Sequence, residues 1–120
     1  MKKFDIYLSE IISPPGSHIQ KGYRPFVVIS NDVANAFSPL VTVVPLTSNV
    51  RRKRLPTQIQ IKTKGLDRES LALCDQLITV DKDRLGKFLG RINNEEDRTA
   101  INRAVSVQLG IIPAETHSAA

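Results

Sequence analysis

Two apolar runs, separated by a short polar segment, constrain this fold more than any other feature of the sequence. Residues 26–30 form a continuous apolar run that ends in Ser30, and residues 40–46 form a second run rich in β-branched side chains. Such runs predict β-strands, the first of them buried on both faces. Arg24 precedes the first run and Thr47 follows the second. Because the start of one antiparallel strand lies beside the end of its neighbour, we expect Arg24 and Thr47 to share one edge of a sheet.

Shorter strand patterns surround these two runs. Residues 4–8 and 58–62 alternate between apolar and polar side chains, which indicates half-exposed strands, with Ile59 and Ile61 facing inward. Two further strand regions are expected, at residues 70–81, which we interpret as one bent strand, and at residues 88–92. Polar segments rich in Gly and Pro separate the strands and predict loops, at residues 13–22, 47–56 and 64–65.

Helical patterns occur twice. A single turn is expected at residues 31–35, with an Asn or Asp at its start as the cap. Asn93 followed by Glu96 has the spacing of a capping box, and apolar residues then recur at helical spacing up to Gly110, which predicts a C-terminal helix of about four turns. The expected fold is therefore α+β and mainly β, a small, strongly curved antiparallel barrel with a helix packed against it.

The length limits the number of domains. A chain of 120 residues can bury a core but is too short for two stable domains, so we expect one domain over residues 1–112 and a frayed tail over residues 113–120. No apolar run approaches the roughly 20 residues that span a bilayer, and charged residues follow Met1 too closely for a signal peptide. The expected location is the cytoplasm, without membrane attachment.

The formal net charge of +5 is unevenly distributed. Residues 1–60 carry 8 Lys and Arg against 3 Asp and Glu, whereas residues 61–120 carry 9 of each kind. Four consecutive basic residues contribute to this excess: Arg51, Arg52, Lys53 and Arg54. A basic cluster favours a polyanion such as RNA as the partner, because it displaces counterions from phosphates. The alternative interpretation is a solvated basic loop.

Residues that bind metals are few and dispersed. The single cysteine, Cys74, lies in an apolar run and is expected to be a small core residue. His18 and His117 are far apart, so there is no zinc pattern. Two acidic pairs alternate along loops without a third ligand and are expected to be solvated: Asp67 with Glu69, and Asp81 with Asp83. We therefore expect neither a metal ion nor a cofactor.

Seven short motifs follow one another along residues 4–111: Gly22-Tyr23-Arg24-Pro25, Val27-Val28-Ile29-Ser30-Asn31-Asp32, Pro45-Leu46-Thr47, Leu55-Pro56-Thr57, Asp75-Gln76, Val80-Asp81-Lys82 and Arg84-Leu85. In order and spacing they resemble the MazF/PemK toxins of bacterial toxin–antitoxin pairs. The resemblance implies an SH3-like barrel with a C-terminal helix, a homodimer, and a MazE-like antitoxin as neutralising partner. It also implies metal-independent, sequence-specific cleavage of single-stranded RNA, including mRNA, which inhibits translation.

The resemblance also assigns site residues. In that family the arginine of the Arg-Pro motif and the threonine after the third strand are the catalytic pair, which here are Arg24 and Thr47. Contacts with RNA are implied for Ser30, Asn31 and Gln76, together with the basic run at residues 51–54. These assignments come from the family, and the neighbouring residues by themselves do not establish them.

Cleavage without a metal requires the 2′-OH of the RNA as nucleophile, which leaves a 2′,3′-cyclic phosphate and a 5′-OH. A guanidinium such as that of Arg24 presents a planar fork of donors to phosphate oxygens, and the hydroxyl of Thr47 adds a further polar contact. Arginine is a weak candidate for a free base. His18 stands where family members commonly have an acid, in a loop one residue longer, and it is a candidate proton carrier if that loop folds over the site. The alternative is an exposed loop histidine.

Two other functions remain open on the residues alone. One is a CcdB-like toxin of the same fold that binds DNA gyrase without catalysis. The other is a basic barrel that binds RNA and does not cleave it. The Arg24 and Thr47 pair with a basic flank favours the nuclease, because a gyrase-binding toxin does not need it.

Overall fold

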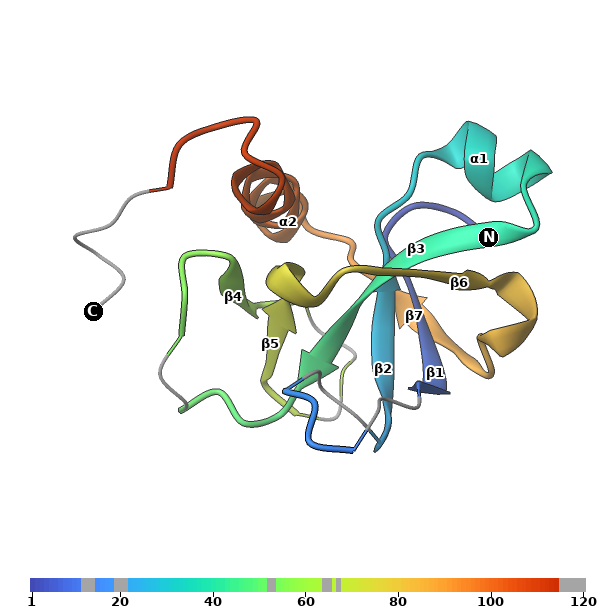
Figure 1. The fold of residues 1–120 in the computed structure, drawn as a ribbon, viewed down its shortest axis with the longest axis horizontal. Coiled ribbons are helices and arrows are strands. Elements are labelled where there is room, and N and C mark those ends of the chain that lie inside the picture. Colours follow the sequence, from blue (N-terminus) through green and yellow to red (C-terminus); the bar gives the residue numbers. More distant parts are fainter. Residues whose placement is uncertain (12–14, 19–21, 52–53, 64–65, 67, 115–120) are drawn as a thin grey trace.

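A computed structural model describes residues 1–11, 15–18, 22–51, 54–63, 66 and 68–114 of the chain. Within this part the chain forms one seven-stranded sheet and two α-helices (Figure 1). The elements follow one another as β1 (Asp5–Ile11), β2 (Gly22–Val28), α1 (Asp32–Phe37), β3 (Leu40–Thr47), β4 (Gln58–Ile61), β5 (Ser70–Leu73), β6 (Ile78–Asp81), β7 (Phe88–Arg91) and α2 (Glu95–Gln108). Short 3₁₀ turns at Cys74–Gln76 and Lys82–Arg84 follow β5 and β6.

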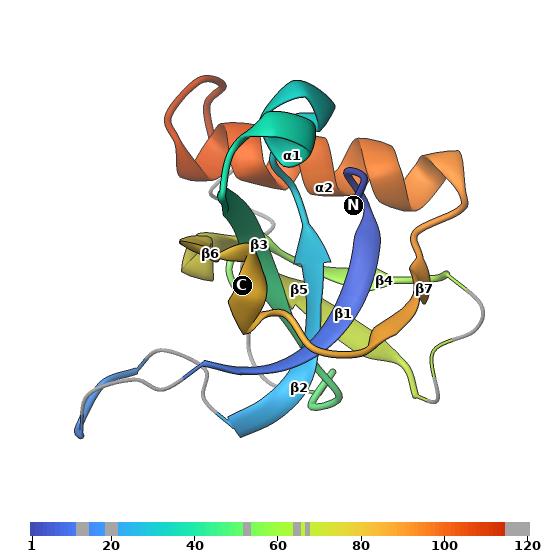
Figure 2. The same ribbon diagram turned by 90° about the vertical axis from the view of Figure 1, so that its right-hand side faces the viewer.

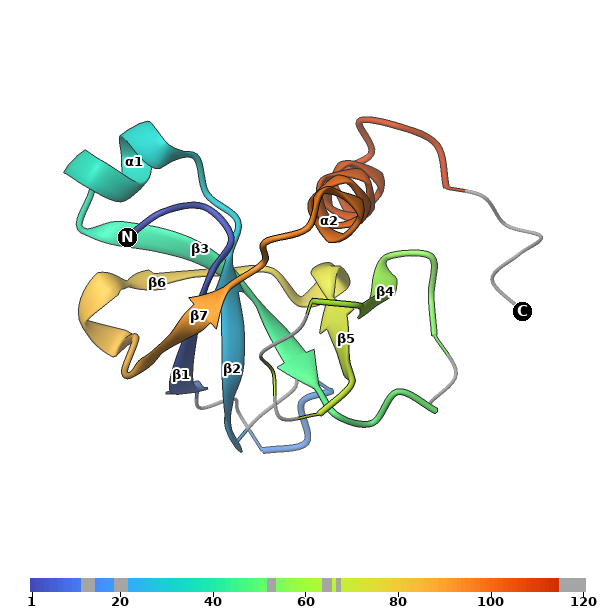
Figure 3. The ribbon, with the colours of Figure 1, turned by 180° about the vertical axis from the view of Figure 1, so that it is seen from behind.

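The sheet is antiparallel throughout the described strands and is strongly curved. Its hydrogen-bonded order is β4-β5-β3-β2-β1-β7, and β6 pairs with β3 beside this path. The view from behind shows β1, β2 and β7 side by side (Figure 3). The expected curved antiparallel sheet with a C-terminal helix is confirmed. The end of β1, the start of β2 and the end of β3 gather at the lower edge of Figure 1, and this edge positions the site.

The core lies on both faces of β2, as the continuous apolar run predicts. Val27 packs in the larger core cluster, which α2 joins through Ile101 and Ala104. Phe26 and Val28 project to the other face and pack in a second cluster with β3. Burial of these side chains provides the main favourable free energy of folding. Strand β2 is therefore the rigid central strand of the sheet.

Both helices begin and end with recognisable caps. Asn31 caps α1 by accepting a hydrogen bond from the amide of Ala34 at 2.8 Å, as expected. Helix α2, seen end-on in Figure 1 and along its length in Figure 2, begins one residue later than the Asn93 box predicts, because Asn94 is the cap. The amide of Asp97 donates to Asn94 Oδ1 at 2.8 Å. At the other end Gly110, with φ +73°, completes the expected C-terminal cap.

Two strand predictions differ from the structure in physically informative ways. Residues 70–81 do not form one continuous strand, because the turn at Cys74–Gln76 separates β5 from β6, although both strands pair with β3. The strand at residues 58–61 does not alternate as predicted, because Gln58 is buried. Its amide donates to both carboxylate oxygens of Asp75 at 3.1 Å. The hydrogen bonds to a charged partner compensate for burying a polar side chain.

Several smaller predictions concern single residues. Cys74 is a buried core residue, and burial, with a smaller effect of Asp75, raises the pKa of its thiol to about 12. The carboxylates of Glu69, Asp81 and Asp83 are exposed, as expected for solvated charges. Some predictions lie wholly or partly outside the described residues: much of the loop at residues 13–22, the turn at residues 64–65, Asp67, and most of the tail at residues 113–120.

Candidate functional site

Arg24 lies inside β2 rather than just before it. The strand begins at Gly22, because β1 continues to Ile11 and provides a pairing partner for the polar residues that precede the apolar run. Arg24 is paired with Ser9 of β1, whereas the pairing of β2 with β3 ends at Phe26. The sequence pattern predicts that Arg24 stands at the end of its strand. This is wrong for the pairing of β2 with β1, which continues past Arg24, and right for the pairing of β2 with β3, which ends before it. The backbone of Arg24 is therefore paired with β1 and lies beyond the paired part of β3.

The strand register brings Arg24 and Thr47 to the same end of the sheet. Phe26 is paired with Pro45, Val27 with Val44, and so on in antiparallel register. When this register is continued by two residues, Arg24 lies opposite Thr47. Residues opposite one another on neighbouring strands project to the same face of a sheet. The register thus fits the expected juxtaposition of a guanidinium and a hydroxyl.

The Arg24 side chain is partly desolvated. Its Nε atom is shielded from solvent, and burial lowers the pKa of the guanidinium from its ordinary value. Even a lowered arginine pKa leaves the group charged at neutral pH. A positive charge in a partly buried position interacts more strongly with an anion than one in bulk water. Arg24 is therefore suited to bind a phosphate.

Thr47 is fixed at the last position of β3. The residue is only 6% exposed and is paired with Leu71 of β5. Its Oγ1 atom accepts a hydrogen bond from the amide of Asn49 at 3.3 Å. A hydroxyl that accepts one hydrogen bond still carries a proton that it can donate. The backbone thus orients the Thr47 hydroxyl at the end of the sheet where Arg24 lies.

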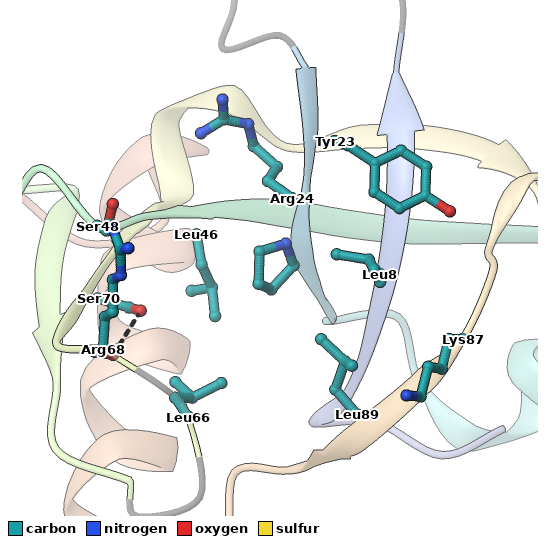
Figure 4. Close-up of a pocket in the computed structure, with 11 residues that line it drawn as sticks. Leu8, Tyr23, Arg24, Leu46, Ser48, Leu66, Arg68, Ser70, Lys87 and Leu89 are labelled. Atoms are coloured by element: carbon teal, nitrogen blue, oxygen red, sulfur yellow. Dashed lines mark hydrogen bonds between the residues drawn. The ribbon is translucent and has the colours of Figure 1, made fainter.

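A cavity of about 740 Å³ borders this end of the sheet (Figure 4). It is lined by Leu8, Tyr23, Arg24, Pro25, Leu46, Ser48, Leu66, Arg68, Ser70, Lys87 and Leu89. The leucines lie in the middle of Figure 4, with Lys87 and Tyr23 towards one side and Arg68 and Ser48 towards the other. Its described lining contains three cationic side chains and no carboxylate. The cavity therefore favours an anionic ligand that also has an apolar part.

Sequence reasoning did not identify Arg68 and Lys87 as site residues. Lys87 is brought to the cavity because its carbonyl accepts a hydrogen bond from the amide of Leu8 at 2.8 Å, which ties the segment before β7 to β1. Arg68 precedes β5 and reaches the cavity from the opposite side. Both residues lie in polar segments that look like ordinary surface in the sequence. Only the pairing of distant strands places them beside Arg24.

Two predicted RNA contacts lie far from Arg24. Ser30 and Asn31 follow the other end of β2, six residues further along, which corresponds to about 20 Å of extended chain. Ser30 Oγ donates to Asn35 Oδ1 at 2.5 Å and accepts from the amide of Thr42 at 3.1 Å. Asn31 caps α1. Their hydrogen bonds within the chain give both residues structural roles at a distance from the Arg24 site.

The remaining candidates are distributed over the surface. Arg51 and Arg54 are exposed in the loop that follows β3, while Arg52 and Lys53 lie outside the described residues. Gln76 is half-buried in the turn after β5. A further candidate, His18, is exposed and is not among the residues that line the cavity. The loop after β3 starts next to Thr47, so Arg51 is the described member of the basic run closest in sequence to the site.

A family model described as PemK-like, MazF-like toxin of type II toxin-antitoxin system matches residues 2–109. The chain belongs to this family. The endoribonuclease MazF of Staphylococcus saprophyticus is 33% identical over 121 residues, covering 99% of each chain. The endoribonuclease EndoA of Bacillus subtilis is 33% identical over 114 residues, covering 93% of this chain and 97% of its own. A solved mycobacterial endoribonuclease in complex with its cognate antitoxin is 25% identical, with a TM-score of 0.74 over 93% of this chain and 97% of that chain.

The family resemblance predicted from the sequence motifs is thus confirmed over nearly the whole chain. The MazF/PemK-like fold is shared with relatives that match it almost end to end. Within the described residues, no helix is both long and apolar enough to cross a membrane. The same residues hold no group of three or more His, Cys, Asp and Glu side chains arranged as metal ligands.

Proposed function

We propose that this protein is an endoribonuclease toxin that cleaves single-stranded RNA, including mRNA, at Arg24 and Thr47 without a metal ion. The observation that supports the proposal is the strand register, which, when continued by two residues beyond its last pair, brings Arg24 of β2 opposite Thr47 of β3. The two relatives that are 33% identical are both named endoribonucleases.

The proposed chemistry starts from the substrate's own nucleophile. The 2′-OH attacks the adjacent phosphorus in line, the bond to the 5′-oxygen breaks, and the products carry a 2′,3′-cyclic phosphate and a 5′-OH. Negative charge gathers on the non-bridging oxygens during this step. The Arg24 guanidinium donates hydrogen bonds to these oxygens from a fixed position, and preorganised donors of this kind are worth about 10²–10³ in rate. The Thr47 hydroxyl donates a hydrogen bond to the same oxygens.

The proton carrier in this mechanism is a separate question. Arg24 acts as an electrostatic donor, because a charged guanidinium does not take up a proton. His18 is the candidate whose imidazole can take up and release a proton, and its role requires the β1–β2 connection to bring it to the phosphate. His18→Gln is then expected to lower kcat while RNA binding is retained. An unchanged kcat identifies His18 as an exposed loop residue.

The proposal is tested by incubating the pure protein with a long single-stranded RNA in excess EDTA. We expect discrete fragments, with activity unaffected by the chelator. In parallel, DNA gyrase supercoiling is measured with the same protein preparation. Intact RNA together with inhibited gyrase would favour the CcdB-like alternative, and RNA that is bound but uncut would favour the non-catalytic barrel.

We further propose that the protein acts in the cytoplasm, where mRNA is translated, and that a MazE-like antitoxin neutralises it. The excess of positive charge in residues 1–60 suits a disordered, acidic antitoxin segment that covers the RNA site. The mycobacterial structure, which contains a cognate antitoxin, supports this type of partner. A neutraliser that proves to be neutral and fully folded contradicts this part of the proposal.

A homodimer is the remaining part of the proposal. Val33 and Phe37 are 72% and 86% exposed, and their spacing places them on the same face of α1. Large apolar side chains exposed together are typical of an interface. Sedimentation at micromolar concentration is expected to give the mass of a dimer. A monomer under these conditions contradicts the assignment.

A further inference from the structure

The cavity beside Arg24 is a continuation of the main core that the helix does not cover. On the face of the sheet towards α2, Ile6, Val27 and Val44 form a buried row across β1, β2 and β3. The next row on that face begins with Leu8 paired with Pro25. The register continues it to Leu46 of β3. Leu8 and Pro25 are partly exposed and line the cavity, whereas Leu46 lines it only with the edge of a side chain that is buried in the main core.

Leu8 and Pro25, which are paired across β1 and β2 and are partly exposed, give the cavity an apolar floor. Paired residues on neighbouring strands are separated by about one strand spacing of 4.7–4.9 Å. Leu89 of β7 closes the floor on one side. Together, Leu8, Pro25 and Leu89 offer an apolar surface on which one nucleobase can lie.

Cationic groups border this apolar floor. Lys87 and Arg68 approach it from opposite sides in Figure 4, and the Arg24 side chain runs along a third border. The hydroxyls of Ser48 and Ser70 also line the cavity, and Ser70 Oγ donates to the carbonyl of Arg68 at 3.1 Å. A base with a phosphate on each side has this combination of a flat apolar face, polar edges and negative charge.

The exposed ring of Tyr23 extends the same surface. Tyr23 is 64% exposed and lines the cavity from β2, two residues before Pro25 and therefore on the same face of the strand. Unpaired bases stack on exposed aromatic rings, and proteins use this contact widely for single-stranded RNA. An acidic peptide could also pair its carboxylates with the cations, but most of its side chains cannot stack on the ring of Tyr23 as a base does.

We propose that this cavity binds one unpaired base of the RNA, adjacent to the phosphate held at Arg24. The inference rests on the proposed nuclease function and adds a specific subsite to it. Arg24 and Thr47 project to one face of the sheet, while Pro25 and Leu46 project to the other, so the RNA chain passes round the open end of β2 and β3. The base lies on Leu8 and Pro25, and Lys87 and Arg68 contact the flanking phosphates.

The base contact is tested with an oligonucleotide that spans a cut site mapped on the long RNA. The nucleotide at that site carries a 2′-O-methyl group to prevent cleavage, and each position in turn is made abasic. Affinity is measured for the wild-type protein, for Leu89→Ala, and for the control Leu109→Ala, which truncates an exposed leucine that is not in the cavity lining. We expect one abasic position to weaken wild-type binding about 5- to 100-fold, the range of a lost base stack.

The decisive comparison is between the variants. At that one position the abasic penalty shrinks in Leu89→Ala and keeps its wild-type size in Leu109→Ala. The base subsite is overturned if the abasic penalty at every position is the same in Leu89→Ala as in the wild type. The nuclease proposal still stands in that case, provided that the wild type cleaves RNA and Arg24→Ala does not. If Leu89→Ala binds the purified antitoxin more weakly but leaves every abasic penalty unchanged, the cavity binds a peptide. This result also overturns the base subsite. An RNA that is neither bound nor cut removes both proposals.

The phosphate contact has its own matched control. Lys87→Ala and Lys2→Ala each remove one exposed lysine, but only Lys87 lines the cavity. Lys87→Ala is expected to lower the slope of log affinity against log salt by about 0.7, the value for one phosphate contact on a single strand. Lys2→Ala keeps the wild-type slope. Equal slopes in the two variants contradict the contact with the flanking phosphate.

Discussion

The guanidinium of Arg24 lies against the backbone of Gly22. A Cβ atom added at Gly22 would lie 3.2 Å from the Nη2 atom of Arg24, closer than ordinary van der Waals contact. Gly22 also has φ +99°, a conformation that side chains disfavour. The position of the Arg24 guanidinium, the proposed catalytic group, therefore depends on a glycine two residues earlier in the same strand.

Gly22→Ala is expected to lower kcat about tenfold with little change in KM, because the new methyl group shifts the guanidinium without removing its charge. Small misplacements of a catalytic group have large effects on rate, reaching about 10²-fold for 1 Å. The measurement is single-turnover cleavage of RNA.

The matched control for Gly22→Ala is Gly16→Ala. Gly16 also has positive φ, at +78°, but a Cβ atom there meets nothing within 4 Å. Both variants should lose stability by about 1–2 kcal/mol, the cost of a left-handed conformation. Only Gly22→Ala should lose catalytic rate. Equal rates in the two variants would show that Gly22 has no positioning role.

Thr47→Ala is expected to lower the rate of cleavage by about 10- to 100-fold, less than the loss of a charged donor. Thr47→Ser is the control, because it keeps the hydroxyl and should retain most of the activity. The rates are compared at saturating protein, with thermal unfolding recorded for each variant. If Thr47→Ser is as slow as Thr47→Ala, the methyl group and its packing matter and the hydroxyl does not.

Changing the basic run, Arg51, Arg52, Lys53 and Arg54, to serine should weaken RNA binding about equally on all sequences. If about three of these charges meet phosphates, the run accounts for a slope near −2 in log affinity against log salt, from about −0.7 per contact. The substituted protein should show a correspondingly flatter slope. A slope that does not change assigns the run to a solvated loop.

Asp97 connects the start of α2 to the end of β4. Its buried carboxylate accepts hydrogen bonds from the amide of Lys62 at 2.9 and 3.0 Å, from Thr63 Oγ1 at 2.6 Å and from Asn94 Nδ2 at 2.9 Å. Burial alone raises the pKa of Asp97, but the hydrogen bonds from Thr63, Lys62 and Asn94 outweigh it and hold that pKa below its ordinary value.

A lowered folded-state pKa makes the contribution of Asp97 depend on pH in a definite direction. The stabilisation is fully present above the unfolded-state pKa of about 3.9 and is lost as the pH falls through the lower folded-state value. Asp97→Asn should therefore destabilise the protein by about 1–3 kcal/mol at pH 7. The difference in free energy of unfolding from the wild type should narrow below about pH 4. Urea denaturation at pH 7 and below about pH 4 measures the free energies of unfolding of both proteins. If the wild type and Asp97→Asn differ by the same amount at the two pH values, the ionised carboxylate does not have this role.

The part of the site that the sequence predicts is the part defined by local patterns. The apolar runs at residues 26–30 and 40–46 place Arg24 and Thr47 at neighbouring strand ends. This inference needs only the antiparallel rule. Strand β2 begins earlier than predicted, because Tyr23 and Arg24 are polar and pair with a β1 that extends beyond its apolar pattern. The hydropathy of neighbouring residues does not show which distant segment a strand pairs with.

The cavity could not be predicted for a related reason. Arg68 and Lys87 come from segments whose composition is that of an ordinary surface, and both reach the site only through long-range packing. The same limit explains the buried Gln58, whose partner Asp75 is 17 residues away. Periodicity shows which face a residue takes in a regular element, but it does not show which distant residue compensates a buried polar group.

The most direct test of the proposed cleavage mechanism is end-group analysis of RNA cleaved in EDTA by the wild-type protein and by Arg24→Ala. We expect fragments with 2′,3′-cyclic phosphate and 5′-OH ends from the wild type, and a rate at least about 10²-fold lower for Arg24→Ala, with its fold retained. Fragments with 5′-phosphates, cleavage abolished by EDTA, or a near wild-type rate for Arg24→Ala would contradict it.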